Sequence, residues 1–332
     1  MRYEIIATLG PASASPAIWQ KMITAGATSF RLNTSHLTLE QLAVWLEKIR
    51  DFRGQSGLPI PLVLDLQGSK WRLGKFPTYD LQKGEIVELV HCAQIAVAHH
   101  LPVPHADFFR AAQYSDGQII LNDAKSRLEV ISAAAESLTA RVVTGGKISA
   151  HKGITFGETQ FRIEAISEKD SQILRMAAQD GSIRYAISYV RDADEMKKYR
   201  QLMGKKAYLV AKLERAPAIT QAEEIARYCD EIWMCRGDLG AELGLRGMAV
   251  AVAAFTQKIA RLPLPALMAG QVLEHMTAQP APTRSEVCYL LEMLMQGYRG
   301  FVLSDETAIG QYPVESCQIA GLFLSEDIQP MV

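Results

Sequence analysis

The stretch PLVLDLQGSKWRLG, residues 61–74, marks the point at which one pattern of secondary structure replaces another. Its first part is a continuous apolar run, which is typical of a strand buried on both faces of a parallel sheet. The preceding segments YEIIATLG and TSFRLN also predict strands, and a helical segment follows each of them. Beyond the stretch, residues 73–159 form short alternating segments separated by Gly, Asp and Pro turns. The chain is therefore predicted to begin as an alternating β/α protein that is interrupted after its third strand.

The β/α alternation resumes near residue 160 and continues through the rest of the chain. Strands are predicted in YAISYV, KAYLVAKLE, EIWMCRGDLG, PALMAG and GFVLSDETA, and a helical segment follows each. With the first three strands they make eight β/α units, which favours a (β/α)8 TIM barrel. We therefore predict a barrel of residues 1–72 and 160–332, with residues 73–159 as a small all-β domain inserted after strand 3. An open, doubly wound sheet is the alternative that the number of units does not exclude.

The composition is that of an ordinary globular enzyme. Of the 332 residues, 48% are hydrophobic and 21% are charged, and the net charge is -1. This balance argues against a nucleic-acid partner, which would favour a basic surplus. No run approaches the ~20 apolar residues that a membrane-spanning helix needs, and the N-terminal apolar run predicts a strand rather than a leader. The five cysteines include no CxxC pair, so we expect reduced thiols and a cytoplasmic location.

Charged side chains stand at the ends of several predicted strands, where barrel enzymes place their chemistry. A single charge at such a place is more often only the solvated edge of a sheet. Here, however, the carboxylates of Glu214 and Asp238 would converge on one barrel mouth, together with the cations Arg31, Arg72 and Lys212. Paired carboxylates suit Mg²⁺, which keeps several waters for substrate oxygens. The three cations could clamp a transferring phosphoryl group, so the set predicts phosphoryl transfer.

The motifs that carry these residues resemble those of the pyruvate kinase family. In order along the chain they are ATLGPAS, FRLNTSH, LDLQGSKWRLG, ISEKD, AKLE, CRGDLGAE, GQVLEHM, APTRSEV and, ending near residue 315, SDETAIGQYPVE. The resemblance implies a (β/α)8 barrel with a β-rich domain inserted after its third strand. It also implies a Mg²⁺-dependent phosphotransferase acting on phosphoenolpyruvate, or a related 2-phospho-enol acid, and on ADP or ATP, with Mn²⁺ as an alternative ion.

The resemblance assigns roles to residues at the barrel mouth. Lys212 would stabilise the charge that develops between phosphoryl donor and enolate, and Arg31 would contact the transferring phosphoryl group. Glu214 and Asp238 would hold the divalent ion, while the backbone around Gly237 and Asp238 would touch the substrate carboxylate. The remaining assignments are Arg72, Lys152 and His36 for nucleotide binding, Asp123 for a lid position, and Asn33, Ser35, Asp65 and the carbonyl of Leu66 for a monovalent-cation site.

Two departures from the family concern positive charge. In LQGSK, Lys70 stands where many members have Glu, and Gln67 stands where they have Lys. An ammonium group is a compact charge that can take the place of K⁺, and members with this lysine do not depend on K⁺. We therefore expect that K⁺ is not required; a solvated surface lysine is the alternative. Arg215 replaces the usual Asn, which would suit a more acidic substrate unless the side chain points to solvent.

A third departure lies in PALMAGQVLEHM, residues 265–276. Gly270 falls where the family has a threonine beside the methylene carbon of the substrate, and that hydroxyl is implicated in proton delivery to the enolate. General acid catalysis is typically worth ~10²–10⁴-fold in rate, so ordinary pyruvate kinase activity should be weakened. The lost side chain would also leave room for a substituent on carbon 3. A water in the place of the hydroxyl is the alternative.

The last departure is that the chain stops near the end of the eighth barrel helix. The family's C-terminal domain carries sugar-phosphate regulation and part of the tetramer interface, so we expect neither, and a homodimer is left open. Two other functions are alternatives. One is a Mg²⁺-enolate lyase or aldolase acting on a pyruvate-like acid, which would not need Arg31, Arg72 and Lys152 together. The other is a catalytically weakened kinase that acts as a binding or regulatory module, although every charged catalytic position is present.

Overall fold

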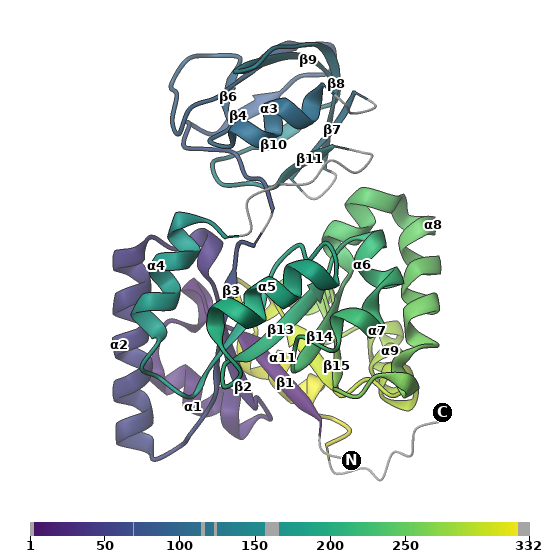
Figure 1. The fold of residues 1–332 in the computed structure, drawn as a ribbon. Helices are drawn as coiled ribbons and strands as arrows, with labels where there is room; N and C mark the ends of the chain where they lie inside the picture. Colours follow the sequence, from purple (N-terminus) through teal and green to yellow (C-terminus); the bar gives the residue numbers. More distant parts are fainter. Residues whose placement is uncertain (1–2, 69, 114–116, 123–124, 157–165, 325–332) are drawn as a thin grey trace. The chain divides into compact units, whose positions relative to one another are not determined.

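The computed structural model describes residues 3–68, 70–113, 117–122, 125–156 and 166–324. Eight parallel strands form a closed barrel in the order β1-β16-β15-β14-β13-β12-β3-β2 (Figure 1). The closure confirms the predicted (β/α)8 fold and excludes the open sheet. The barrel strands are β1 (Glu4–Thr8), β2 (Ser29–Asn33), β3 (Leu62–Leu66), β12 (Ile183–Ile187), β13 (Tyr208–Leu213), β14 (Glu231–Cys235), β15 (Ala266–Ala269) and β16 (Gly300–Leu303).

Helices connect successive strands of the barrel (Figure 1). Their ends carry ordinary capping signals; for example, the Thr38 hydroxyl accepts from the backbone of Gln41 at the start of α2, and Gly57 ends that helix at a φ of 70°. The helices are α1 (Pro16–Thr24), α2 (Leu39–Ser56), α4 (Glu168–Ala177), α5 (Ala193–Met203), α6 (Ala216–Thr220), α7 (Ala222–Ile225), α8 (Arg236–Thr256), α9 (Arg284–Met295), α10 (Asp305–Ala308) and α11 (Pro313–Ala320).

The interior of the barrel is a packed core. All five residues of β3 are buried, as expected of a strand enclosed on both faces. Side chains from seven of the strands meet inside, and the buried residues of this cluster are Ile6, Val63, Ala186, Val210, Trp233, Cys235, Leu267, Ala269 and Val302. Such a filled interior is rigid, so residues at the strand ends are held by a fixed scaffold.

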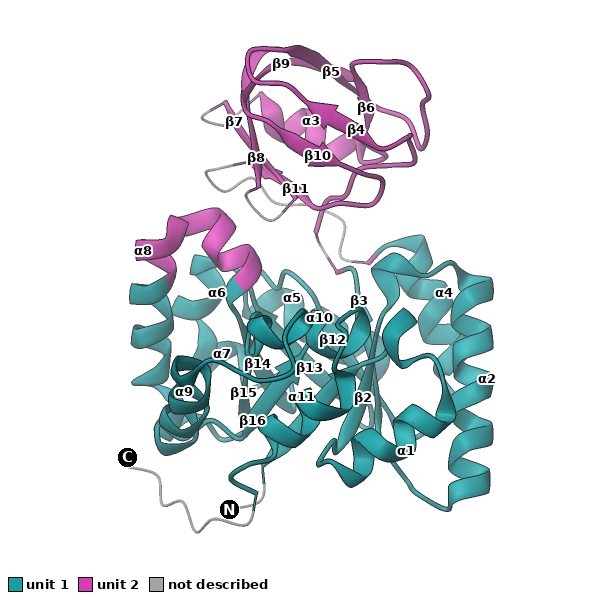
Figure 2. Cartoon of the chain, turned by 180° about the vertical axis from the view of Figure 1, so that it is seen from behind, with its two compact units in different colours: residues 1–67, 167–236, 249–332 teal, residues 68–166, 237–248 magenta. Residues whose placement is uncertain are grey.

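The chain divides into two compact units (Figure 2). The barrel unit comprises residues 1–67, 167–236 and 249–332, and the second unit comprises residues 68–166 and 237–248. The insertion therefore follows β3, as the change of pattern in residues 61–74 predicts. Residues at the start of α8 belong with the second unit rather than with the barrel.

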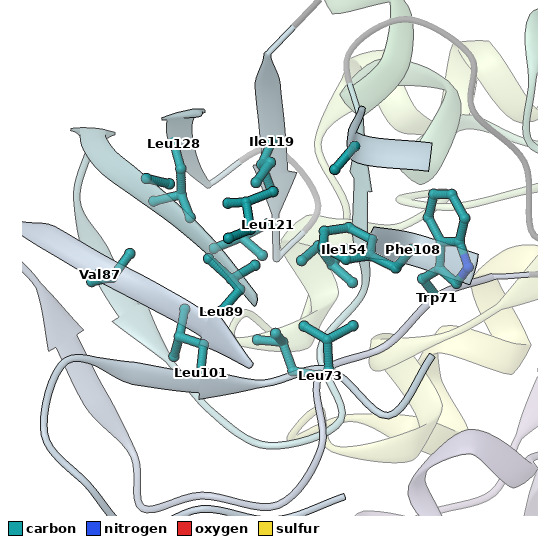
Figure 3. Packing of buried hydrophobic residues seen from close by; sticks show 14 of the residues in the cluster. Trp71, Leu73, Val87, Leu89, Leu101, Phe108, Ile119, Leu121, Leu128 and Ile154 are labelled. Atoms are coloured by element: carbon teal, nitrogen blue, oxygen red, sulfur yellow. The ribbon is translucent and has the colours of Figure 1, made fainter. Parts of the chain in front are cut away.

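The inserted part consists mainly of short strands. A sheet in the order β11-β7-β8-β9-β5-β6 stands beside a two-stranded sheet of β10 and β4. Its core gathers Trp71, Leu73, Phe108 and Ile154, with the Trp71 and Phe108 rings 5.3 Å apart and edge to face (Figure 3). The strands are β4 (Tyr79–Leu81), β5 (Ile86–Val90), β6 (His100–Pro102), β7 (Gln118–Leu121), β8 (Ser126–Ala133), β9 (Ser137–Thr144), β10 (Gly146–Ile148) and β11 (Ile154–Phe156). A seven-residue helix, α3 (Ala106–Ala112), was not predicted by the alternating pattern.

Helix α8 is interrupted by one residue with a non-helical backbone conformation. The RGDLG motif that follows β14 is already helical, and the backbone leaves helical geometry at Gly244, where φ is 68°. Among the described residues, only the helical segment 236–261 is long and apolar enough to cross a membrane, with a mean hydropathy of 1.3. Length and composition are weak evidence for such a role, and this segment connects two neighbouring strands of a closed barrel.

Candidate active site

Asp65 is the centre of a buried charged network at the C-terminal ends of the barrel strands. Its Oδ2 atom accepts from Arg31 Nε at 2.7 Å, and its Oδ1 atom accepts from Lys212 Nζ at 3.0 Å. The hydroxyl of Ser188 also donates to Oδ1, at 2.9 Å. These residues come from β2, β3, β13 and the tip of β12, so the closed barrel brings together residues that are far apart in the sequence.

Lys212 extends this network to Glu214. Its ammonium nitrogen lies 3.1 Å from Glu214 Oε1 and donates to the Ser188 hydroxyl at 2.8 Å. At the other end of the network, Arg31 Nη1 donates to the hydroxyl of Thr8 at 2.8 Å. The result is an ordered series of alternating charges, Arg31, Asp65, Lys212 and Glu214, in which every member is buried.

The network keeps Asp65 and Lys212 ionised. Burial would raise the pKa of Asp65, but Lys212 and Arg31 outweigh it and hold that pKa at about 2. Burial would likewise lower the pKa of Lys212, but Asp65 and Glu214 raise it above its usual range. Burial, followed by the charge of Glu214, raises the pKa of the nearby Cys235 thiol well above its ordinary value. Lys212 is therefore a fixed cation at neutral pH rather than a proton acceptor, and Cys235 is a neutral thiol.

Ser188 and Tyr189 belong to this site, although the strand-end analysis missed them. The backbone N–H of Tyr189 donates to Glu214 Oε2 at 2.6 Å. The predicted strand YAISYV ran to residue 190, whereas β12 ends at Ile187. Because of that difference, the sequence predicts these two residues inside a strand rather than at its tip. The hydroxyl of Ser188, directly after a buried run, was the signal that could have found them.

The residues predicted to hold a monovalent cation have protein partners in the barrel unit. The Asn33 side chain accepts from the backbone N–H of Ser35 at 3.3 Å, and the carbonyl of Leu66 accepts from the N–H of Ser188 at 3.4 Å. Asp65 binds the cationic side chains described above. His36 lies close by in the short 3-10 helix Thr34–His36. The assignment of these oxygens to a monovalent cation remains a prediction.

Lys70 is buried in the second unit and binds Asp238. Its ammonium nitrogen lies 2.5 Å from Oδ1 and 2.6 Å from Oδ2 of that carboxylate. The side chain passes over Gly153, where an added Cβ would lie 2.4 Å from Lys70 Cε. Only 8% of Lys70 is exposed, so it is not a solvated surface lysine.

The predicted nucleotide-binding residues of the second unit lie on facing backbone segments. Arg72 forms an antiparallel bridge with Gly153, and the N–H of Leu73 donates to the carbonyl of Lys152 at 2.9 Å. The Arg72 guanidinium donates to the carbonyl of His151 at 2.9 Å. Arg72 and Lys152 are thus close together on two hydrogen-bonded backbone segments. Asp123, the predicted lid residue, lies outside the described residues.

Gly270 directly follows β15 and has an unusual backbone conformation. Its φ is 85°, and that of Gln271 is 55°. The carbonyl of Gly270 accepts from Arg236 Nε at 2.9 Å and from Nη2 at 2.5 Å. Because L side chains rarely adopt such φ values, and β-branched ones least of all, the backbone at this position suits glycine and disfavours threonine.

Gly237 and Asp238 lie in the first turn of α8. Backbone N–H groups in the first turn of a helix have no intrahelical partner and carry a partial positive charge. This environment is suited to a substrate carboxylate, which is the role predicted for the Gly237–Asp238 backbone. An added Cβ at Gly237 would meet no atom within 4 Å.

The predicted metal ligands are carboxylate oxygens, which hard cations such as Mg²⁺ prefer. Within the ranges that the structure describes, no group of three or more His, Cys, Asp or Glu side chains could hold a metal ion. Mg²⁺ does not need such a group, because it commonly uses one or two carboxylates and shares its other positions between water and substrate phosphates. Glu214 in the barrel unit and Asp238 in the second unit are oxygen donors of this kind, and their assignment to one divalent ion remains a prediction.

The barrel, its charged mouth and the domain inserted after β3 together define a class: (β/α)8 enzymes with a charged network at the C-terminal ends of the strands. Comparison with known proteins narrows that class. Residues 1–317 match the sequence model of the family described as "Pyruvate kinase, barrel domain". The chain belongs to the pyruvate kinase family, which confirms the resemblance of its motifs.

Relatives in this family are identical to the chain at about a third of the aligned residues. "Pyruvate kinase" of Methylorubrum extorquens is 34% identical over 317 residues, which cover 95% of this chain and 66% of that protein. "Pyruvate kinase 2" of Synechocystis sp. is 32% identical over 346 residues, covering 99% of this chain and 58% of that protein. "Pyruvate kinase" of Thermococcus litoralis is 33% identical over 321 residues, covering 95% of this chain and 67% of that protein. The chain thus spans about two thirds or less of the length of these relatives.

Proposed function

We propose that this chain transfers a phosphoryl group between phosphoenolpyruvate, or a related 2-phospho-enol acid, and ADP. The observation that carries the proposal is the buried series Arg31, Asp65, Lys212 and Glu214, in which the pKa shifts keep both an ammonium and a carboxylate charged. Phosphoryl transfer depends mainly on positioning and on neutralising charge, and preorganised charges of this kind supply both.

Arg31 and Lys212 have separate tasks in this reaction. Arg31 binds the phosphoryl group as a forked donor, and Lys212 stands where negative charge develops on the enol oxygen. The bond between phosphorus and the enol oxygen breaks as an oxygen of the β-phosphate of ADP bonds to phosphorus. The electron pair stays on the enol oxygen and gives the enolate of the product. Asp65 holds both cations in place through its two carboxylate oxygens.

A divalent ion fits this proposal, with Glu214 and Asp238 as its protein ligands and Mg²⁺ as the favoured ion. When bound, it would neutralise charge on the phosphoryl group and on the substrate oxygens. The chain itself contributes the carboxylates and the donors that orient them, such as the Tyr189 N–H on Glu214. The first turn of α8, around Gly237, binds the substrate carboxylate.

Nucleotide phosphates are bound by Arg72 and Lys152, with His36 as a further contact. The adjacent positions of Arg72 and Lys152 on two hydrogen-bonded backbone segments support a shared role in binding one anionic group. We propose in addition that K⁺ is not required. The buried ammonium of Lys70, held on Asp238, supports this because it is a fixed positive charge that needs no exchange with solvent.

Proton delivery to the enolate is the step at which this chain should differ from its relatives. Gly270 offers no hydroxyl, so carbon 3 of the enolate takes its proton from water. This arrangement should slow turnover of ordinary phosphoenolpyruvate, since a positioned general acid is typically worth ~10²–10⁴-fold in rate. It should also tolerate a substituent on carbon 3.

A coupled assay of ADP phosphorylation tests the function. Phosphoenolpyruvate and its 3-substituted analogues would be offered with Mg²⁺, in the presence of either K⁺ or a bulky organic cation. We expect turnover that is independent of K⁺, and a ratio of substituted to unsubstituted substrate that is higher than for a relative with the threonine. Absence of turnover on all substrates, by a protein that still binds Mn²⁺, would contradict the proposal.

A further inference from the structure

Arg215 is a fully buried cation that directly follows Glu214, a proposed metal ligand, in the sequence. It lies between β13 and α6, next to Glu214 in the chain, and only 2% of it is exposed. From the sequence, Arg215 could be either a cation at the mouth that suits an acidic substrate or a side chain that points to solvent. Because Arg215 is buried, its side chain does not point to solvent. A buried guanidinium loses much hydration, so its position should be tied to favourable contacts.

One such contact is the aromatic ring of Tyr189. The guanidinium carbon of Arg215 lies 4.7 Å from the centre of that ring, within the range of a cation–π interaction. Tyr189 is itself 5% exposed, so the pair is desolvated and the interaction is at the strong end of its range. The tip of β12 is therefore packed under the segment that leaves β13.

The backbone of Tyr189 needs such support. Its φ is 62°, in a region that a residue with a side chain rarely adopts. A backbone held in this region persists only when its surroundings fix it, and such positions gather at functional sites. Here the conformation has a visible consequence, because it directs the Tyr189 N–H to Glu214 Oε2 at 2.6 Å. The other oxygen of Glu214 lies 3.1 Å from Lys212.

We propose that Arg215 is a positioning residue for Glu214 and acts through Tyr189. The guanidinium holds the ring, the ring fixes the strained turn, and the N–H of that turn orients the carboxylate that would hold the divalent ion. The inference rests on the proposed function, in which Glu214 is a metal ligand. Residues that orient metal ligands in this way typically change metal affinity by about 10- to 100-fold when they are replaced.

Mn²⁺ binding to the full chain, measured by electron paramagnetic resonance without substrate, tests the inference. Arg215→Met keeps an unbranched apolar stem in place of the arginine stem and removes the guanidinium. We expect Mn²⁺ to bind about 10- to 100-fold more weakly. Tyr189→Leu removes the ring but keeps the N–H, and it should weaken Mn²⁺ binding similarly. Combining the two should add little, because both changes break the same link.

Arg53→Met is the matched control. Arg53 is another mostly buried arginine of the barrel unit, and it binds Asp180 at 2.9 Å. The Arg53→Met substitution should leave Mn²⁺ affinity within about twofold of wild type, whatever its effect on the thermal midpoint, because Arg53 supports no proposed metal ligand. Mn²⁺ binding by the Arg215→Met variant that equals wild type would overturn the inference, as would equal weakening by Arg53→Met. If Arg215→Met does not fold, Tyr189→Leu decides in its place by the same criterion.

Glu214→Gln separates this inference from the proposed function. Suppose that Glu214→Gln binds Mn²⁺ more weakly, whereas Arg215→Met and Tyr189→Leu bind it unchanged. This result would contradict the positioning role of Arg215 and leave the proposed function standing. Unchanged Mn²⁺ binding by Glu214→Gln would instead remove Glu214 as a metal ligand, and the proposed function would fail at that point.

Discussion

The two ends of the barrel both bury charged side chains, but they do so with opposite results. At the mouth, Asp65 lies between Arg31 and Lys212, and its pKa is held at about 2. At the N-terminal end, Glu231 at the start of β14 accepts from the hydroxyl of Tyr208 at 2.9 Å and from the indole of Trp233. Burial, followed by the nearby Glu4, raises the pKa of Glu231 to about 7.

The difference follows from the balance of charges around each carboxylate. Burial favours the neutral form at both ends, so the partners decide the outcome. Asp65 is bound by two cations, Arg31 and Lys212, the second of which also lies 3.1 Å from Glu214. Within the described part of the chain, the one cation paired with Glu231 is Arg184, at 3.5 Å, which also binds Glu4 at 2.8 Å. The mouth is therefore a preorganised charged site. At the N-terminal end, by contrast, the buried carboxyl of Glu231 keeps its proton up to about pH 7 and is held by hydrogen bonds. This division agrees with the usual separation of function and stability between the two ends of such barrels.

Replacing the central cation of the mouth should have the largest effect. We expect Lys212→Met to lower kcat about 10³-fold, because it removes a preorganised charge from the place where the enolate develops. ADP binding, measured calorimetrically, should persist. Arg184→Met at the opposite end is the control, and it should change kcat less than about threefold while lowering stability. Comparable losses of kcat in the two variants would mean that the ends do not differ in function.

Asp65→Asn tests whether the mouth depends on its carboxylate for stability. Removing one partner of a buried ion pair typically costs about 3–5 kcal/mol, and here it would leave two cations poorly compensated. Urea unfolding at pH 7 should show a loss of this size. Glu4→Gln is the matched change at the N-terminal end. Because 32% of the Glu4 side chain is exposed, its loss should stay below about 1 kcal/mol. Equal losses would remove the distinction.

Stability should depend on pH in opposite directions at the two ends. Glu231 keeps its proton in the folded state up to about pH 7, whereas in the unfolded state it loses it near 4.5. Between these values the folded state binds more protons, so the free energy of unfolding falls as pH rises, by at most about 3 kcal/mol from this group. Asp65, with its pKa of about 2 against an ordinary 3.8, makes stability fall as pH drops between those values.

The measurement for Glu231 is a difference between two pH profiles. Unfolding of wild type and of Glu231→Gln would be followed from pH 4 to pH 8. The two curves should diverge above pH 4.5, with the wild type losing more stability than the variant until about pH 7. Parallel curves over this range would show that Glu231 has an ordinary pKa in the folded protein.

The sequence predicted the barrel and most of its charged mouth, because strand periodicity locates the strand ends and charged residues stand out there. It could not predict the partners of Asp65, since these come from other strands and depend on closure of the barrel. Tyr189 was missed for a local reason, because the strand before it ends earlier than its apolar run. The N-terminal network was also missed, since Glu4 and Glu231 at strand starts resemble ordinary solvated edges.

Backbone strain is a further difference between the two ends, and it gives the smallest expected effect. Among the described residues of the barrel unit, the non-glycine residues with positive φ are Tyr189 and Gln271, and both follow the C-terminal end of a strand. Gly270 shares this conformation, with a φ of 85°. Gly270→Ala should therefore cost about 1–2 kcal/mol of unfolding free energy from strain alone. Gly54→Ala, in helix α2 with open space around the added Cβ, should instead stabilise by about 0.5–1 kcal/mol. If the two changes shifted the urea midpoint in the same direction, strain would not distinguish the mouth from the rest of the barrel.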